Sequence, residues 1–312
     1  MEGKEASILI IGAGVNGSAC ATILHKSGID ITLLARGERY EEIRENGIII
    51  ENPLNHTRSV EKVKVVNTLN PTDFYDYIFV IMRKNQALEL LPVLAVNCSP
   101  NIVFMGNTLS SPEEYTTFLG KDRVLMGSVY AGGRREGNVI KAMVSTKLAV
   151  PFGEINGTIT PRIERLVTLL NQGISRAQIS THIVDELITH SAAVIPIGYL
   201  VLKHGSQTRN LAKSTTDLYL LVDAIRDGFK VLQKLGFQIL PKSNEFFFNY
   251  VPKFILVTLM RILFNSKFGQ VGIEYHVSQA PDEMQHLAKE MRTLVEKAGL
   301  PVPALREVLD MK

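Results

Sequence analysis

The sequence predicts an α/β protein in which a doubly wound parallel sheet is followed by an all-helical C-terminal domain. In the first half of the chain, short apolar runs alternate with segments of helical periodicity, as in a parallel sheet that helices cover on both faces. A glycine-rich turn joins the first apolar run to a helix. From about Val184 onward, helical periodicity dominates and strand-like runs disappear.

Length and composition describe an ordinary folded protein. Because a domain has about 100–200 residues, the 312 residues suggest two domains, which we place at residues 1–180 and 181–312. Charge is nearly balanced, with 34 basic and 31 acidic residues, so no nucleic-acid partner is expected. Two cysteines exclude a disulfide scaffold, and no Cys/His pair has zinc-site spacing, so we predict no metal.

Targeting and membrane segments are not predicted. The first residues lack the pattern of a signal peptide. Two apolar stretches, Ala192–Leu202 and Phe254–Phe264, are each about eleven residues long, whereas a spanning helix needs about twenty. They are interpreted as buried core helices or as the subunit interface of a homodimer. We therefore expect a cytoplasmic protein without a membrane partner.

A complete β-α-β unit is predicted near the N-terminus. The expected strands are Ser7–Ile11 and Asp30–Ala35, and the expected helix is Ser18–Lys26. The turn between the first strand and the helix has the GxGxxG pattern and consists of Gly12, Ala13, Gly14, Val15, Asn16 and Gly17. A strand before this pattern and a helix after it are typical of a Rossmann-type dinucleotide-binding domain.

The three glycines have separate expected roles. Gly12 permits the tight turn, Gly14 lets the backbone approach a pyrophosphate, and Gly17 lets the helix pack against the strand. The helix N-terminus offers its free N–H groups and positive dipole end to that pyrophosphate. The alternative is a glycine turn with a structural role only.

The end of the second strand favours NADP over NAD. A carboxylate there would accept the ribose 2′-hydroxyl of NAD, but the chain has Ala35-Arg36-Gly37 and no acid at the strand tip. Arg36 can pair with the 2′-phosphate of NADP, and Arg39 lies nearby. The alternative for Arg36 is a solvated loop charge.

Further elements continue the pattern. The expected strands are Tyr77–Met82, Asn101–Met105 and Val124–Val129, and the expected helices between them are Asn85–Asn97 and Pro112–Leu119. In the second half, one amphipathic helix runs through Leu218 and Leu232 to Gly236. Another helix, Met284–Ala298, ends at Gly299.

Several stretches of the first 160 residues carry a family likeness. They are Gly12–Gly17, Leu34–Gly37, Ile43–Ile48, Arg83–Gln86, Asn107, Gly127, Gly132–Val139 and Phe152–Glu154. Together they resemble the ketopantoate reductase (2-dehydropantoate 2-reductase) family. Asp223–Gly236 and Gly299–Pro303 extend the resemblance more loosely into the helical half.

The resemblance implies an oxidoreductase that transfers a hydride from NADPH to a small 2-keto acid or related ketone. In the family this reaction converts ketopantoate to pantoate in pantothenate biosynthesis. The resemblance places Arg83, Gln86, Asn107 and Gly133 at the cofactor, with Gln86 and Asn107 beside its nicotinamide half. In the family, a lysine on the first long helix of the second domain protonates the forming alkoxide, aided by a glutamate.

At the catalytic positions the sequence departs from the family. The resemblance puts His190 at the lysine and Glu283 at the glutamate. Val194 and Gly198 stand where two asparagines grip the substrate, and Val271 stands where a serine is expected. A protonated His190 can act as the general acid, with Glu283 holding its other nitrogen. The alternatives are an inert, hydrogen-bonded histidine and a glutamate that the helix dipole favours.

Three functions are compatible with these residues. The first is an NADPH-dependent reductase of a small keto substrate. The second is an NADP(H)-binding family member without ketopantoate reductase activity, acting as a sensor or partner protein, because three pocket positions have changed together. The third is a related dehydrogenase with a different substrate.

Overall fold

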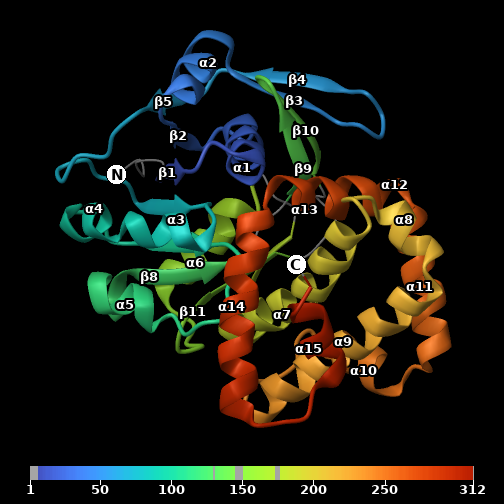
Figure 1. Cartoon of the computed structure of the whole chain (residues 1–312). Coiled ribbons are helices and arrows are strands. Elements are labelled where there is room, and N and C mark those ends of the chain that lie inside the picture. Colours follow the sequence, from blue (N-terminus) through green and yellow to red (C-terminus); the bar gives the residue numbers. More distant parts are fainter. Residues whose placement is uncertain (1–5, 129–130, 145–149, 173–175, 312) are drawn as a thin grey trace. The chain divides into compact units, whose positions relative to one another are not determined.

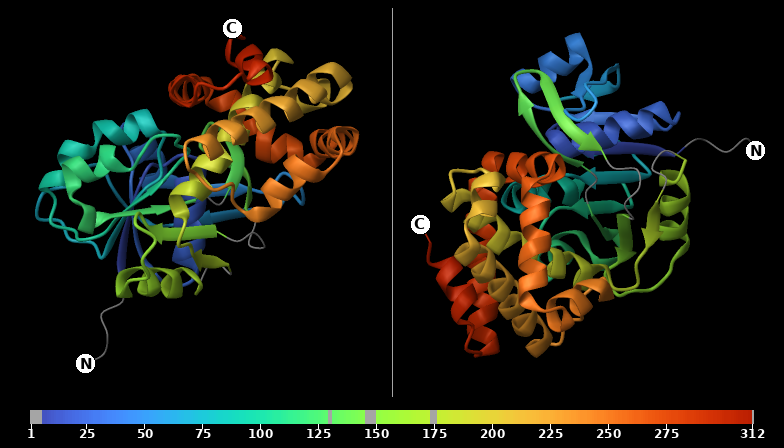
Figure 2. Two further views of the ribbon diagram at one scale, coloured as in Figure 1. Left: turned by 90° about the horizontal axis from the view of Figure 1, so that it is seen from below. Right: turned by 90° about the vertical axis from the view of Figure 1, so that its right-hand side faces the viewer.

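The chain folds into two compact units. The computed structural model describes residues 6–128, 131–144, 150–172 and 176–311. The sheet unit comprises Met1–Gly106 and Ser111–Val184, and the helical unit comprises Asn107–Ser110 and Asp185–Lys312. Figure 1 labels the elements of both units, and Figure 2 gives two further views.

The sheet unit is built on eight strands in the order β12-β11-β8-β7-β6-β1-β2-β5. They are β1 (Ser7–Ile11), β2 (Asp30–Leu34), β5 (Lys64–Val66), β6 (Tyr77–Val80), β7 (Ile102–Met105), β8 (Val124–Gly127), β11 (Val150–Glu154) and β12 (Ala177–Ile179). The predicted parallel sheet is confirmed from β8 to β5. At the other edge, β11 pairs antiparallel with β8. A hairpin rather than a crossover helix separates β8 from β11 along the chain, and only a crossover returns a strand in parallel.

Helices cover both faces of this sheet. They are α1 (Val15–Lys26), α2 (Glu38–Asn46), α3 (Lys84–Glu89), α4 (Leu91–Val96), α5 (Glu113–Leu119), the 3₁₀ helix η1 (Lys121–Arg123) and α6 (Pro161–Leu170). Leu24 of α1 and Leu166 of α6 share one hydrophobic core with Ile10 of β1. On the opposite face, Tyr115 of α5 stacks on Phe104 of β7, with ring centroids 3.9 Å apart. Burial on both faces explains why these strands are apolar throughout.

A second sheet, in the order β4-β3-β10-β9, is not predicted by the sequence. Its strands are β3 (Ile48–Glu51), β4 (Arg58–Glu61), β9 (Ala131–Glu136) and β10 (Val139–Val144). β4 and β9 carry charges and glycines instead of an apolar run, so hydrophobic periodicity does not mark them. Ile140 and Ala142 of this sheet join the core around α1. Because α1 packs against both sheets, consecutive residues such as Ala19 and Cys20 are fully buried.

Two predicted boundaries differ from the structure. The expected helix Asn85–Asn97 is two helices, α3 and α4, because Pro92 lies at the start of the second one and cannot donate an N–H to the first. α1 begins at Val15 rather than at Ser18, since Gly14 already serves as its N-cap. Val129, the last residue of a predicted strand, lies outside the described residues.

The helical unit contains the remaining helices. They are α7 (Ile183–Lys203), α8 (Thr208–Lys213), α9 (Thr215–Lys234), α10 (Lys242–Tyr250), α11 (Lys253–Asn265), α12 (Lys267–Gly269), the π-helix η2 (Gln270–Glu274), α13 (Tyr275–Gln279), α14 (Pro281–Ala298) and α15 (Pro303–Leu309). α7 is long and apolar enough to cross a membrane by length and composition alone, and 56% of its most apolar window is buried inside the protein. The bent pair Lys253–Asn265 and Lys267–Gln279 passes the same test jointly, with a 72° bend. The two apolar stretches differ, because α7 is largely buried whereas Phe254 and Ile262 of α11 are 63% and 62% exposed.

Candidate active site

The glycine-rich turn lies at the carboxyl end of β1. At its first and last positions, no residue larger than glycine fits. Gly12 has a φ of +115°, and a Cβ added there would lie 2.2 Å from the carbonyl oxygen of Ile81. A Cβ on Gly17 would lie 1.8 Å from the carbonyl oxygen of Gly12. Both distances are far below a van der Waals contact, so a side chain at either position would displace the backbone.

The middle of the turn is open. A Cβ added to Gly14 would meet no atom within 4 Å. Gly14 is the N-cap of α1, which has no side-chain cap and no acidic residue in its first turn. The N–H groups at this helix end therefore favour an anion, and an open glycine lets that anion come close to the backbone.

Three residues of the turn hold it in place rather than offer side chains to a ligand. Asn16 accepts a hydrogen bond through Oδ1 from the backbone N–H of Ala131, at 2.9 Å, which connects α1 to β9. The Ala13 carbonyl accepts hydrogen bonds from the Ser18 hydroxyl and from Nε of Arg39. Val15 packs against the core of the sheet unit.

The two arginines after β2 have different environments. Arg39 is only 8% exposed, and its guanidinium contacts the Ala13 carbonyl, Glu42 and the Asn138 carbonyl. Arg39 therefore stabilises the turn through its hydrogen bond to the Ala13 carbonyl. Arg36 is exposed and makes no hydrogen bond or ion pair with any residue that the structure describes. Arg36 is thus the arginine that is free to meet an anionic group at the tip of β2.

The other predicted cofactor residues of the sheet unit lie in two places. Arg83 and Gln86 stand at the start of α3, just beyond the carboxyl end of β6, and Gln86 is exposed. This is the same sheet edge as the glycine-rich turn, because β6 is the parallel neighbour of β1. Gly133 instead lies within β9, where an added Cβ would be 2.4 Å from the Lys141 carbonyl oxygen of β10. Its small size is therefore required by hairpin packing.

Asn107 belongs to the helical unit although it follows β7 of the sheet unit. The segment Asn107–Ser110 is held there by α7 and α14. The N–H of Thr108 donates to Oγ of Ser191 at 3.0 Å. Glu290 accepts hydrogen bonds from the N–H of Leu109 and the hydroxyl of Ser110. These contacts fix the position of Asn107 relative to both helices.

Asn107, Glu283 and a histidine that the sequence did not single out form a polar cluster. Glu283, in the first turn of α14, is 7% exposed. Its Oε1 accepts a hydrogen bond from Nδ2 of Asn107 at 2.9 Å. Its Oε2 lies 3.6 Å from Nε2 of His276, on α13. Both carboxylate oxygens are therefore engaged, and Glu283 is more than a helix-dipole residue.

His190 is solvent-accessible on α7 and hydrogen-bonds to no residue in the described part of the chain. The hydrogen bond expected of an inert histidine is thus not found there, and neither is a direct bond to Glu283. Protein atoms crowded around the imidazole lower its pKa, and the charge of His276 lowers this pKa further.

The positions of the family's substrate-gripping residues have apolar surroundings. A Cβ added to Gly198 would lie 2.4 Å from Sδ of Met284, so α14 fills the space that a longer side chain would need. Val271 is 2% exposed, within η2. Gly198 therefore serves the packing of α7 against α14, and Val271 is a buried residue of η2.

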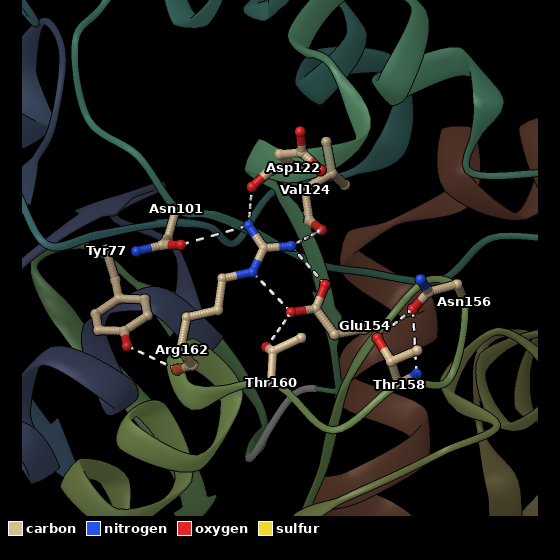
Figure 3. Close-up of polar contacts among 9 residues, drawn as sticks. All are labelled: Tyr77, Asn101, Asp122, Val124, Glu154, Asn156, Thr158, Thr160 and Arg162. Atoms are coloured by element: carbon tan, nitrogen blue, oxygen red, sulfur yellow. Dashed lines mark hydrogen bonds and ion pairs between the residues drawn. The ribbon is translucent and has the colours of Figure 1, made fainter.

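A second polar cluster lies within the sheet unit, between the end of β11 and the start of α6 (Figure 3). The Arg162 guanidinium pairs with both oxygens of the buried Glu154 carboxylate and also donates to backbone carbonyls beside β8. Thr160 donates a further hydrogen bond to Glu154. Burial raises the pKa of Glu154, but the hydrogen bonds of Arg162 and Thr160 and the charge of Arg162 outweigh it and hold that pKa below its usual range.

A cavity of about 630 Å³ opens beside this second cluster. It lies at the amino ends of the parallel strands, whereas ligands of such sheets bind at the carboxyl ends. Glu154 and Arg162 are fully engaged with each other and with the backbone, so we assign them a structural role. No group of three or more potential metal ligands occurs within residues 6–128, 131–144, 150–172 and 176–311.

Comparison with known proteins relates the chain to one family and one fold. Residues 8–157 match the family described as ketopantoate reductase PanE/ApbA, and no curated protein matches the chain. A D-mandelate dehydrogenase solved with NADH and anilino(oxo)acetate is 15% identical, with a TM-score of 0.80 over 98% of this chain and 96% of that one. The 2-dehydropantoate 2-reductase of Geobacter metallireducens GS-15 is 16% identical, with a TM-score of 0.78 over 98% of both chains. A dimeric ketopantoate reductase from Staphylococcus aureus is 16% identical, with a TM-score of 0.70 over 97% and 96%.

These likenesses agree with the architecture described above. At such identities the solved structures establish the fold, a dinucleotide-type sheet unit followed by a helical unit. The family match covers the glycine-rich turn, the residues at the start of α3 and the hairpin of β9 and β10. Residues 8–157 therefore form a domain of the ketopantoate reductase PanE/ApbA family of oxidoreductases.

Proposed function

We propose that the protein reduces a small 2-oxo acid with NADPH as the hydride donor. The observation that carries this proposal is the glycine-rich turn, whose ends admit glycine only while its middle, at Gly14, is open. Family membership supports a nicotinamide cofactor, and the environment of Arg36 favours its phosphorylated form.

The residues of the sheet unit fit such a cofactor. The uncapped N-terminus of α1 suits the pyrophosphate, because its free N–H groups and dipole favour negative charge. The exposed, unpaired Arg36 suits a 2′-phosphate, since a guanidinium can bind two phosphate oxygens at once. No carboxylate at the tip of β2 competes for the 2′ position.

The residues of the helical unit supply the proton. NADPH, when bound, supplies the hydride that adds to the carbonyl carbon of the substrate. The electron pair of the C=O π bond moves to oxygen, which then takes a proton to give the hydroxy acid. We assign this proton to His190, whose imidazole is accessible and not engaged by other described residues. Asn107 and Glu283 form the fixed polar cluster of the same unit.

Absorbance of NADPH during incubation with ketopantoate tests the proposal directly. Turnover with NADPH that exceeds turnover with NADH is expected. His190→Ala should lower kcat by about a hundredfold, the usual contribution of a general acid, while NADPH affinity is unchanged. If wild-type protein binds NADPH but reduces no 2-oxo acid, it is a cofactor-binding protein and the proposed reaction is wrong.

Ketopantoate, the substrate in the family's name, is the first compound to test. Its turnover would indicate a role in pantothenate biosynthesis. The apolar residues Val194, Gly198 and Val271, which stand where the family's polar substrate-gripping residues are expected, favour a second candidate, a 2-oxo acid with an apolar side chain. A series of 2-oxo acids with aliphatic, hydroxylated and aromatic side chains distinguishes the two. A higher kcat/KM for the apolar members would assign the protein to a different substrate within the same chemistry.

We also propose that the protein is a homodimer that associates through one apolar surface of the helical unit. This surface comprises the exposed side chains of α10 and α11, namely Phe246, Phe247, Tyr250, Phe254, Ile255, Leu259 and Ile262. Apolar patches of this kind on soluble proteins commonly mark interaction sites. Light scattering should show a dimer for wild-type protein and a monomer for Ile262→Lys. Val96→Lys, at an exposed position of α4, is the control and should remain dimeric.

A further inference from the structure

Glu283 is held by side chains from two separate segments, and one of them is not assigned by any motif. Asn107 reaches Oε1 from the short segment after β7. His276 reaches Oε2 from α13, seven residues before Glu283 in the sequence. Removing a carboxylate from water is unfavourable unless other groups contact its oxygens, and Glu283 is only 7% exposed. His276 is therefore part of what fixes this acid.

The backbone before His276 is unusual. The five residues Gln270–Glu274 form a π-helix that leads directly into α13. A π-turn changes the phase of the helix that follows it and often occurs at functional sites. The His276 imidazole in the helix that follows is one-third exposed, and its Nε2 lies 3.6 Å from Oε2 of Glu283.

The other titratable groups of the neighbouring helices interact with partners of their own. Glu274, at the end of η2, accepts hydrogen bonds from the N–H and hydroxyl of Thr208. His286 on α14 pairs with Glu290. Asp282 on α14 has its own partner. On α7, the group coupled electrostatically to His276 is His190.

We propose that His276 is a positioning residue of the reduction site, which orients Glu283 against Asn107 and, when protonated, opposes positive charge on His190. This inference deepens the proposed reductase function and rests on it. Because two neighbouring imidazolium groups repel each other, protonation of His276 disfavours protonation of His190.

Two substitutions separate the two effects of His276. His276→Gln keeps a hydrogen-bond donor for Glu283 but removes the charge, and His276→Leu removes both. We expect His276→Leu to lower kcat by about tenfold, because a buried carboxylate loses its nearest ion-pair partner, and His276→Gln to restore most of this loss at the optimal pH. In both variants, the pH at which kcat/KM declines should move upward, because the repulsion on His190 is gone. Equal loss in both, with an unshifted pH profile, would indicate a structural role only.

A measurement without turnover makes the inference independent of the substrate. The imidazole proton signal of His190 can be titrated by NMR in cofactor-free protein, and in His276→Gln its pKa should rise relative to wild type. His25→Gln is the matched control, because His25 forms a similar pair with Glu61 at 3.3 Å in the sheet unit. An unchanged His190 titration in His276→Gln overturns the role of His276. Absence of 2-oxo acid reduction by wild-type protein overturns the proposed function instead.

Discussion

At the residue scale, substitution by alanine should affect Gly17 and Gly14 of the glycine-rich turn differently. Gly17→Ala places Cβ 1.8 Å from the Gly12 carbonyl, so we expect a loss of stability of about 1–3 kcal/mol or more. Gly14→Ala has open space for its methyl group, so its unfolding midpoint should stay near wild type. That methyl group would nevertheless occupy the space of the pyrophosphate and weaken NADPH binding. Urea unfolding and NADPH titration of both variants check this contrast, and equal stabilities would contradict it.

Arg36 determines the choice between the two nicotinamide cofactors if it meets the 2′-phosphate. Arg36→Ala should raise the KM for NADPH by roughly tenfold to a hundredfold, the value of a charged hydrogen bond, and leave the KM for NADH nearly unchanged. Arg44→Ala, which removes a nearby exposed arginine paired with Glu41, is the control. Equal effects of Arg36→Ala on both cofactors would mean that Arg36 is only a solvated charge.

The lowered pKa of His190 predicts the pH dependence of reduction. The protein atoms around the imidazole, and then the charge of His276, disfavour the imidazolium, so the pKa of His190 lies below its usual range. An imidazolium acid becomes scarcer as pH rises through its pKa. We therefore expect kcat/KM to be highest on the acidic side and to decline at a pH below the usual pKa of histidine, about 6.5. His190→Ala should give a low profile without this decline, and a wild-type optimum on the basic side would exclude His190 as the acid.

At the scale of elements, the pair of Glu154 and Arg162 joins the end of β11 to α6 (Figure 3). Arg162→Ala leaves the buried Glu154 carboxylate with Thr160 as its remaining side-chain partner, so we expect a loss of about 3 kcal/mol in unfolding free energy. Arg165→Ala on the same helix removes an exposed pair with Asp76 and should cost less than about 1 kcal/mol. Urea unfolding of the two variants tests the difference.

The same pair predicts how stability changes with pH. The pKa of Glu154 is held below its usual range in the folded protein. Its contribution is therefore present above the pKa of the unfolded state and is lost as pH falls through the folded pKa. Arg162→Ala should reduce this loss of stability in acid, and an unchanged pH dependence would show that the pair does not act on Glu154.

Elements with a clear local pattern were predictable from the sequence, and the others were not. Three such elements are β1, α1 and α14. Each follows an apolar pattern and is followed by a glycine, so it can be predicted without information on long-range contacts. β4 and β9 are polar or glycine-rich and exist because neighbouring strands pair with them. The direction of β11 likewise depends on its pairing with β8.

At the scale of the whole molecule, each compact unit is formed by two segments that are separate in the sequence. The compact units divide at Val184, near the expected boundary at residue 180, but Asn107–Ser110 belongs with the helical unit. Ser191 and Glu290 hold this segment there through side-chain hydrogen bonds. Composition and periodicity carry no sign of this assignment, because it depends on contacts between residues far apart in the chain.

The sequence by itself determined the β-α-β unit, the glycine-rich turn and the arginine at the tip of the second strand. These features lie within a short contiguous segment, and steric demands on glycine and hydrophobic periodicity act locally. Only the tertiary structure decided that Glu283 is shared between Asn107, 176 residues away, and His276. It also decided that Met284 fills the space beside Gly198. Such contacts arise when helices pack, so the physical reason is that packing, rather than local pattern, brings distant side chains together.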